Sequence, residues 1–150
     1  MTMGKIEEKL AKLGYKLPAV WPPGKLELGV KVGNLVFMSG AGSEIRGKLG
    51  RDLTVEEGYK AARECCLQLL GNLKAIIGDL DNVVRFVKLL SMVNSAPDFG
   101  DQPSVAHGCS DLLIDLYGEK AGKHARAAVG MGSLPGGRAV EIEMIVQVKD

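Results

Sequence analysis

Two charged residues near the carboxyl terminus, Arg126 and Glu141, stand in segments that otherwise favour burial. Arg126 lies in the run 125–129 (ARAAV), where a guanidinium is costly to bury unless an anion meets it. The planar guanidinium recognises a carboxylate through two parallel hydrogen bonds. Glu141 could then hold or activate a water molecule. The two residues could therefore form a site for a ligand carboxylate and a water molecule. The alternative without chemistry is an ion pair of Arg126 with Glu141 or Glu143.

Ser39, Gly40 and His107 are three further positions with side chains or backbone suited to ligand contact or chemistry. Ser39 precedes Gly40 at the end of an expected strand, where small residues let a ligand approach the backbone, although a serine there is often only a turn former. His107 falls opposite the apolar stripe of its expected helix, which favours a solvated face over a catalytic base. Ser39 and Gly40 are therefore the predicted substrate-binding residues beside Arg126.

Metal and cofactor sites are not predicted. His107 and His124 have no cysteine or carboxylate at ligand spacing, and the sequence contains neither a P-loop nor a Gly-x-Ser-x-Gly elbow. The three cysteines lie on or beside helical apolar stripes, so we expect reduced core residues rather than nucleophiles: Cys65, Cys66 and Cys109.

Charge and hydropathy limit the classes of binding partner and the cellular location that we expect. The 19 Lys and Arg balance 18 Asp and Glu to a net charge of +1, which argues against nucleic acid or an anionic membrane as partner and favours a small molecule. The first ten residues carry charges where a signal peptide needs an apolar run, and no stretch has the roughly 18 uninterrupted apolar residues of a membrane span. We expect a cytoplasmic protein.

The elements that must position these residues follow from periodicity and turn signals. We expect a short amphipathic helix over 6–13, a Pro-rich segment over 17–25 anchored by Trp21, and strands over 26–32 and 35–39 around Gly33-Asn34. Residues 54–57 form a capping box that opens a helix ending at Gly78. These signals place the long helix after the first strand pair.

The carboxyl-terminal half continues this alternation. Residues 83–93 predict a central strand buried on much of both faces, and a second helix runs from about Pro103 to Gly118. Residues 124–148 predict two strands joined as a hairpin at 134–137. The order predicts a two-layer α+β fold, one mixed sheet with helices on one face. At 150 residues, we expect one domain over 1–150, with 1–25 as an N-terminal helix and Pro-rich extension.

The last strand alternates, so its two faces can be assigned. The positions that share the predicted core face are Val140, Ile142, Met144, Val146 and Val148. The opposite face carries Glu141, Glu143, Gln147 and Lys149 beside Ile145. That mixture is too apolar for open water and too polar for a core, which predicts a subunit interface.

Several of these motifs together resemble the RidA/YjgF family, once called L-PSP endoribonucleases or translation inhibitors. The resemblance rests on Gly33-Asn34, the strand 35–40 (LVFMSG), and Arg126 followed by Leu134-Pro135 and 140–143 (VEIE). It covers about residues 26 to 148, and the N-terminal segment suggests a divergent branch.

The resemblance implies a chorismate-mutase-like fold, a homotrimer and ligand clefts between subunits. It further implies a cofactor-independent enamine or imine deaminase that converts a reactive 2-imino acid into a 2-oxo acid and ammonia. Arg126 would bind the substrate carboxylate, Glu141 would place the water, and Ser39 would line the cleft.

Two alternatives remain open. Family members often carry a cysteine at the position of Ala128 and a tyrosine at that of Leu26, and a further asparagine has no clear match here. A non-catalytic trimer that binds a small carboxylate metabolite is therefore the first alternative. An RNA endonuclease or translation inhibitor, as in the older family label, is the second.

Overall fold

The computed structural model describes residues 3–20 and 24–150, so the predicted anchor Trp21 lies outside the described residues. The helices are α1 (Lys5–Lys12), α2 (Val55–Ile77) and α3 (Gln102–Gly122), with short 3₁₀ turns at Leu80–Asn82 and Pro135–Gly137. The strands are β1 (Gly29–Val32), β2 (Leu35–Met38), β3 (Ala41–Gly42), β4 (Val83–Asn94), β5 (Ala125–Met131) and β6 (Val140–Val148).

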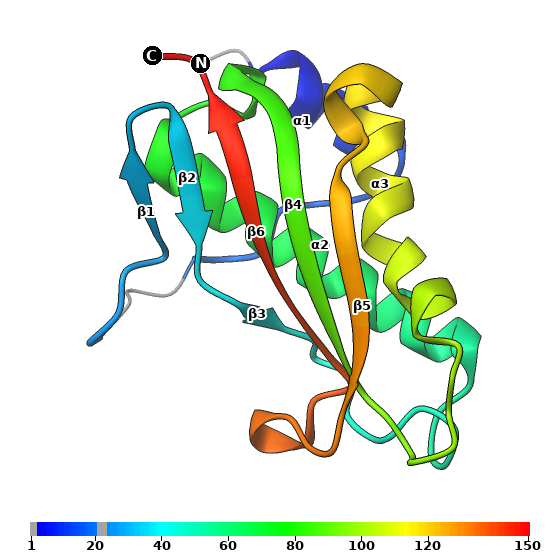
Figure 1. Cartoon of the computed structure of the whole chain (residues 1–150). Helices are drawn as coiled ribbons and strands as arrows, with labels where there is room; N and C mark the ends of the chain where they lie inside the picture. Colours follow the sequence, from blue (N-terminus) through cyan, green and yellow to red (C-terminus); the bar gives the residue numbers. More distant parts are fainter. Residues whose placement is uncertain (1–2, 21–23) are drawn as a thin grey trace.

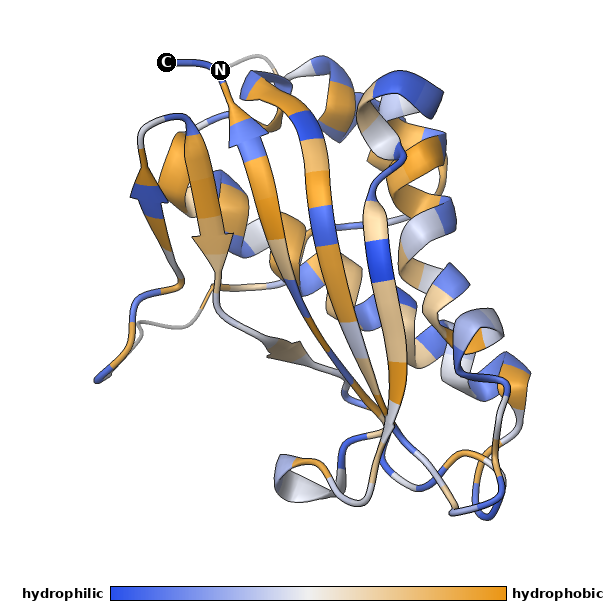
Figure 2. Ribbon diagram, in the orientation of Figure 1, coloured by the Kyte–Doolittle hydropathy of each residue, from blue (hydrophilic) through white to orange (hydrophobic). Residues whose placement is uncertain are grey.

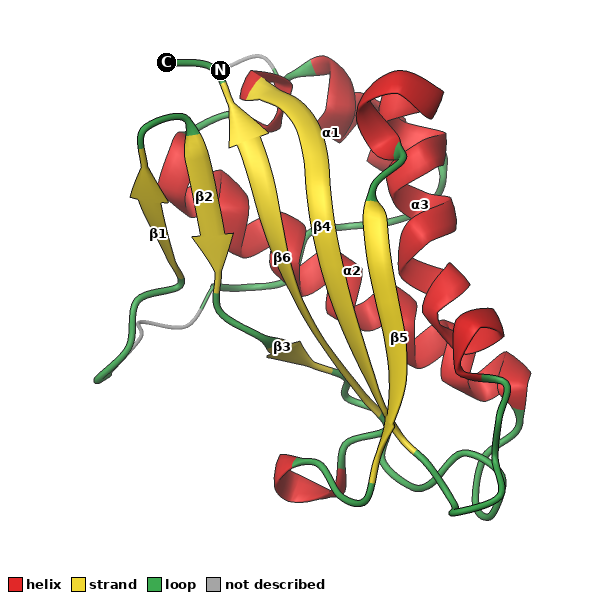
Figure 3. Ribbon diagram, viewed as in Figure 1, coloured by secondary structure: helices red, strands yellow, loops and turns green. Residues whose placement is uncertain are grey.

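The strands form one mixed sheet in the order β1-β2-β6-β4-β5, with β3 paired to β6. The β4–β5 pair is parallel and the other pairs are antiparallel. In Figure 1 and Figure 3, α2 runs behind the strands, and α3 lies beside the edge strand β5 and packs against α2. No described α-helix lies in front of the strands. The predicted two-layer α+β, chorismate-mutase-like architecture is confirmed.

The predicted hairpin between the last two strands is wrong. β4 lies between β5 and β6, so β5 is the edge strand and β6 pairs with β4 and β2 instead. The segment 132–139 is long enough to pass one strand, and Arg138 within it donates to the Ser43 carbonyl (2.5 Å). A turn signal fixes a local change of direction but not which strands become neighbours.

The helix boundaries follow the predicted signals closely. The Thr54 hydroxyl accepts from the Glu57 amide (3.2 Å), and the Glu57 carboxylate accepts from the Thr54 amide (3.0 Å), which confirms the capping box. Gly78 takes φ 87° after the last turn of α2. Gly118, at φ 77°, interrupts α3 where its end was predicted, and one further turn continues to Gly122.

The core lies between the helices and the sheet. β6 buries every second residue from Val140 to Val148, as its alternation predicts, and Figure 2 shows hydrophobic colour recurring along β6 and β4. The prediction that β4 is buried on both faces is wrong in part, because Lys88 is exposed and Leu90 only half-buried on the side without helices. Lys88 and Leu90 thus belong to an open sheet face.

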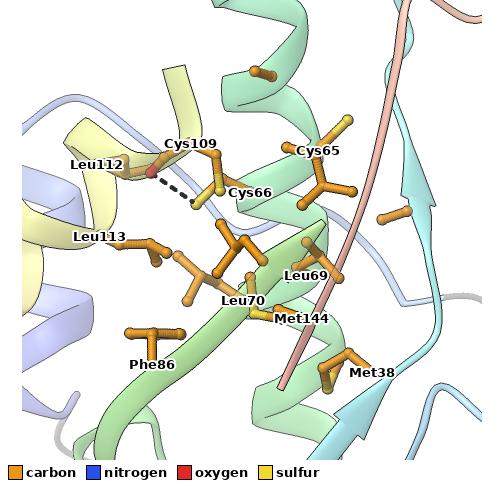
Figure 4. Close-up of a cluster of buried hydrophobic side chains, with 14 of the residues drawn as sticks. Met38, Cys65, Cys66, Leu69, Leu70, Phe86, Cys109, Leu112, Leu113 and Met144 are labelled. Atoms are coloured by element: carbon orange, nitrogen blue, oxygen red, sulfur yellow. Dashed lines mark hydrogen bonds between the residues drawn. The ribbon is translucent and has the colours of Figure 1, made fainter. Parts of the chain in front are cut away.

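The three cysteines are free and buried among the leucines of α2 and α3 (Figure 4). Burial raises the pKa of the Cys65 and Cys66 thiols well above the usual range, so neither is a thiolate near neutral pH. The prediction that they are core residues is confirmed. Ile6 and Leu10 of α1 belong to the same core.

Candidate functional site

The guanidinium of Arg126 contacts two side chains of α3. Its Nη1 lies 3.0 Å from His107 Nδ1 and donates to Ser110 Oγ at 3.0 Å. Arg126 pairs in register with Leu89, whose side chain is fully buried beneath the helices, so Arg126 projects from the helix-covered side of the edge strand β5. Across residues 3–20 and 24–150, no carboxylate pairs with it.

A second histidine extends this chain of contacts. Ser110 Oγ lies 2.9 Å from His124 Nε2, and His124 Nδ1 lies 2.7 Å from the Gly122 carbonyl oxygen. Ser110 is almost completely buried, whereas His107 is exposed. The contacts therefore run from His107 through Arg126 and Ser110 to His124.

These side chains border an open hollow between α3 and the start of β5, of about 470 Å³, which Asp111, Ile114 and Lys123 complete. Burial, and secondarily the positive charge of Arg126, lowers the pKa of His124, against the opposing hydrogen bond to Gly122. A neutral His124 can accept a hydrogen bond from Ser110, and the hollow also carries the charged side chains of Asp111 and Lys123 beside Arg126.

Two spacings in the sequence point to this cluster. His107 and Ser110 are three residues apart and share a helix face, while His124 and Arg126 are two apart and share a strand face. The prediction that His107 is solvated is confirmed by its exposure, and its contact with Arg126 is the addition that the structure makes.

Glu141 lies in a different hollow, of about 330 Å³, bordered by Gly40, Gly42, Arg138 and residues of α2. A Cβ atom on Gly40 would lie 2.8 Å from Glu141 Oε2, so only glycine leaves the carboxylate its present position. Ser39 adjoins this region, but its hydroxyl donates to the Glu27 carbonyl (2.7 Å), the turn-forming use that was the alternative. Sequence reasoning missed Arg138, the cation of this hollow.

The structure does not bring Arg126 and Glu141 together within one chain. Glu141 pairs with Met92 of β4, which projects to the open side, whereas Arg126 pairs with Leu89, which projects to the covered side. No ion pair of Arg126 with Glu141 or Glu143 forms between these described residues. The two predicted catalytic residues belong to opposite faces of the sheet, with β4 between their strands.

Two absences concern the described part of the chain. It contains no group of three or more His, Cys, Asp or Glu side chains arranged to hold a metal ion. None of its helices combines the length and the apolar character that crossing a membrane requires.

Comparison with known proteins identifies the family of this chain. A family model described as "YjgF/chorismate_mutase-like, putative endoribonuclease" matches residues 8–140. The chain belongs to this family. It is 43% identical to Protein TCP17 of Trypanosoma cruzi over 154 residues, which cover 98% of this chain and 96% of that protein.

Solved structures divide into close and distant relatives. Protein Atu1372 of Agrobacterium tumefaciens, of unknown function, superposes with a TM-score of 0.90 at 38% identity, covering 96% of this chain and 92% of that one. RidA from the Antarctic bacterium Psychrobacter superposes with a TM-score of 0.55 at 24% identity, covering 89% of this chain and 97% of that one. At that identity the likeness shows the shared fold alone. The chain thus represents a divergent branch of the RidA/YjgF family.

Proposed function

We propose that this chain is a cofactor-independent imine deaminase that hydrolyses a small 2-imino acid to a 2-oxo acid and ammonia. The observation that carries the proposal is Arg126. Its guanidinium is half-buried, and both Nη1 hydrogens meet neutral acceptors, while Nε and Nη2 have no hydrogen-bond partner in the described chain. The Nε–Nη2 edge is the fork that binds a carboxylate with two parallel hydrogen bonds.

Hydrolysis of an imine requires a water molecule and a group that accepts a proton from it. With the substrate carboxylate on Arg126, Glu141 accepts a proton from water as its oxygen attacks the imine carbon and the C=N electron pair moves to nitrogen. Glu141 returns this proton to the nitrogen, which gives a carbinolamine. Transfer of the carbinolamine hydroxyl proton to nitrogen through the same carboxylate then expels ammonia and leaves the 2-oxo acid. Positioned acid–base catalysis contributes on the order of 10²–10⁴-fold, and imines hydrolyse readily.

Arg126 and Glu141 would meet only between copies of the chain. β5 is the edge strand and carries Arg126 to the rim of the sheet, whereas Glu141 belongs to the open face. That face also bears Phe37, 45% exposed, beside Ile145 and the charged pair Lys88 and Glu143. Such a mixed surface suits self-association, and we propose a homotrimer with one site at each subunit contact.

The direct test follows 2-oxo acid release from freshly generated 2-iminopropionate. We expect Arg126→Gln and Glu141→Gln each to reduce the rate enhancement over the uncatalysed reaction by about 100-fold or more. That is the effect expected when a residue that binds the substrate carboxylate, or one that accepts a proton from water, is removed. Arg51→Gln is the matched control, because Arg51 is an exposed arginine whose only ion pair within residues 3–20 and 24–150 is with the adjacent Asp52. Wild-type rates no higher than those of Arg126→Gln would refute the proposal.

The proposed assembly has its own test, which mixes the two inactive variants after unfolding and refolding them together. A site built from Arg126 of one subunit and Glu141 of the next regains both residues in about a quarter of random pairings. Recovery of about that share of wild-type activity supports the inter-subunit site. If sedimentation shows that the mixture is trimeric and no activity returns, both residues belong to the site of one subunit.

An endoribonuclease is the second candidate, because the family description includes that activity and both histidines lie beside Arg126. Paired histidines can act as general base and acid in RNA cleavage. The net charge of +1 offers little attraction to a polyanion, which ranks this candidate below the first. RNA cleavage that survives repurification and disappears in His107→Asn would reverse the order.

A non-catalytic carboxylate binder is the remaining alternative, favoured by Ala128 and by the commitment of the Ser39 hydroxyl to Glu27. Calorimetric binding of pyruvate without any turnover of 2-iminopropionate would support it. A cytoplasmic location is proposed with either function and agrees with three free thiols.

A further inference from the structure

We propose that Ser110 and His124 are positioning residues for Arg126, so that carboxylate binding at this site requires a neutral His124. The inference rests on the proposed role of Arg126 and deepens it. It concerns the four-member contact chain His107, Arg126, Ser110 and His124, in which every donor and acceptor can be assigned.

The direction of each hydrogen bond follows from arginine, which only donates. His107 Nδ1 must accept from Arg126 at 3.0 Å, so its proton is on Nε2. The Gly122 carbonyl only accepts, so His124 carries its proton on Nδ1, 2.7 Å away. His124 Nε2 is then free to accept the Ser110 hydroxyl hydrogen at 2.9 Å.

Ser110 consequently points one lone pair at Arg126 and its hydrogen at His124. The hydroxyl would otherwise rotate freely, and the bond to His124 fixes it as an acceptor for Nη1. With His107 on its other hydrogen, Nη1 is held at two points, which fixes the plane of the guanidinium. The Nε–Nη2 edge is thereby oriented before any ligand arrives, which lowers the entropic cost of binding.

Protonation of His124 would reverse this arrangement. Nε2 would become a donor, so His124 and Arg126 would compete for Ser110 Oγ as two like charges across one hydroxyl group. The other charged groups around the hollow are already engaged: Asp111 accepts from the Tyr59 hydroxyl at 2.7 Å, and Lys123 lies 3.8 Å from Glu119. His107 is the other titratable group facing Arg126.

The experiment titrates the full-length protein with pyruvate, a stable 2-oxo acid, by calorimetry between pH 5 and 8. We expect Ser110→Ala to weaken binding about tenfold at pH 8, the effect of one lost hydrogen bond to a charged group. His124→Gln, whose amide oxygen can still accept from Ser110, should bind within about threefold of wild type and lose the pH dependence assigned to His124. Ser104→Ala is the control, because Ser104 lies on the same helix outside the hollow and its hydroxyl donates to Asp101.

A second readout does not depend on ligand. Nitrogen-15 spectra of the imidazoles should show the Nδ1–H form of His124 and the Nε2–H form of His107. If Ser110→Ala does not fold, these spectra and His124→Gln carry the test.

The outcomes separate this inference from the proposed function. Loss of pyruvate binding in Arg126→Gln with wild-type affinity in Ser110→Ala would overturn the positioning role and leave the function standing. Unchanged binding in Arg126→Gln would overturn the function instead. An Nε2–H form of His124 at pH 8 would overturn the positioning chain whatever the binding results.

Discussion

Replacing Gly108 with alanine should loosen the contact between α2 and α3 and, with it, the hold on Arg126. A Cβ atom on Gly108 would overlap the carbonyl oxygen of Tyr59 and lie 3.1 Å from Ala62 Cβ. Neither atom can move cheaply, because the Tyr59 oxygen is part of the α2 backbone and the Ala62 Cβ is bonded directly to that backbone. The helices must therefore separate by roughly 1 Å to restore ordinary contact distances.

The size of the effect follows from two opposing contributions. Overpacking of a close contact destabilises by about 1–3 kcal/mol, occasionally more, while glycine to alanine inside a helix returns at most about 1 kcal/mol. We expect a net loss of about 1–2 kcal/mol in the free energy of unfolding, which lowers the Tm of a domain of this size by about 2–8 °C. Gly132→Ala is the control, since no atom lies within 4 Å of its added Cβ.

The same variant should weaken ligand binding, because Gly108 lies between His107 and Ser110 on α3. A helix displacement of roughly 1 Å would carry their 3.0 Å contacts with Arg126 beyond hydrogen-bond range. Pyruvate titration and thermal unfolding are measured on the same preparation. A Gly108→Ala protein as stable as wild type would refute the packing argument, and a destabilised one with unchanged pyruvate affinity would refute its extension to the site.

Three further predictions concern other elements. Thr54→Ala removes half of the capping box and should cost about 1 kcal/mol in chemical unfolding. Ser91→Ala should raise stability by about 1 kcal/mol, because Ser91 Oγ is buried without a partner in the described structure. The Asp81 carboxylate accepts hydrogen bonds from the amides of Ile6 and Lys5, which lowers the pKa of Asp81. Its stabilisation of α1 is therefore present above the pKa of the unfolded chain and is lost as pH falls through the pKa of the folded protein. Amide exchange in α1 should accelerate relative to α2 below about pH 4, whereas the control variant Asp81→Asn should show no such acceleration.

Local signals in the sequence were sufficient for most elements and for one face of the sheet. The capping box at Thr54 and the glycines at 78 and 118 mark helix ends through backbone geometry that no distant contact needs to supply. The alternation of β6 gives its buried face directly. Strand order is different, because it depends on pairings between residues far apart in the chain, and no local pattern distinguishes a hairpin from a strand pair separated by β4.

The site was predictable only in part for the same reason. Arg126 stands out because it is a cation in an apolar strand, but its partners belong to α3 and to the residues just before β5. Arg138 could not be distinguished from a surface arginine, since its contact with Ser43 depends on how β3 meets β6. Side-chain chemistry can nominate a residue, whereas the identity of its neighbours requires the topology.

The strand order also decides between the two explanations first considered for Arg126. In a β5–β6 hairpin, Arg126 would lie on a strand adjacent to Glu141 and Glu143, where an ion pair could close the site. With β4 between the strands and the side chains on opposite faces, that pair cannot form within one chain. A half-buried guanidinium that no carboxylate of the described chain neutralises still favours an anion. On the proposed function a ligand supplies this anion, and the alternative source is a carboxylate of a second copy of the chain. Pyruvate binding in wild type but not in Arg126→Gln distinguishes the first from the second.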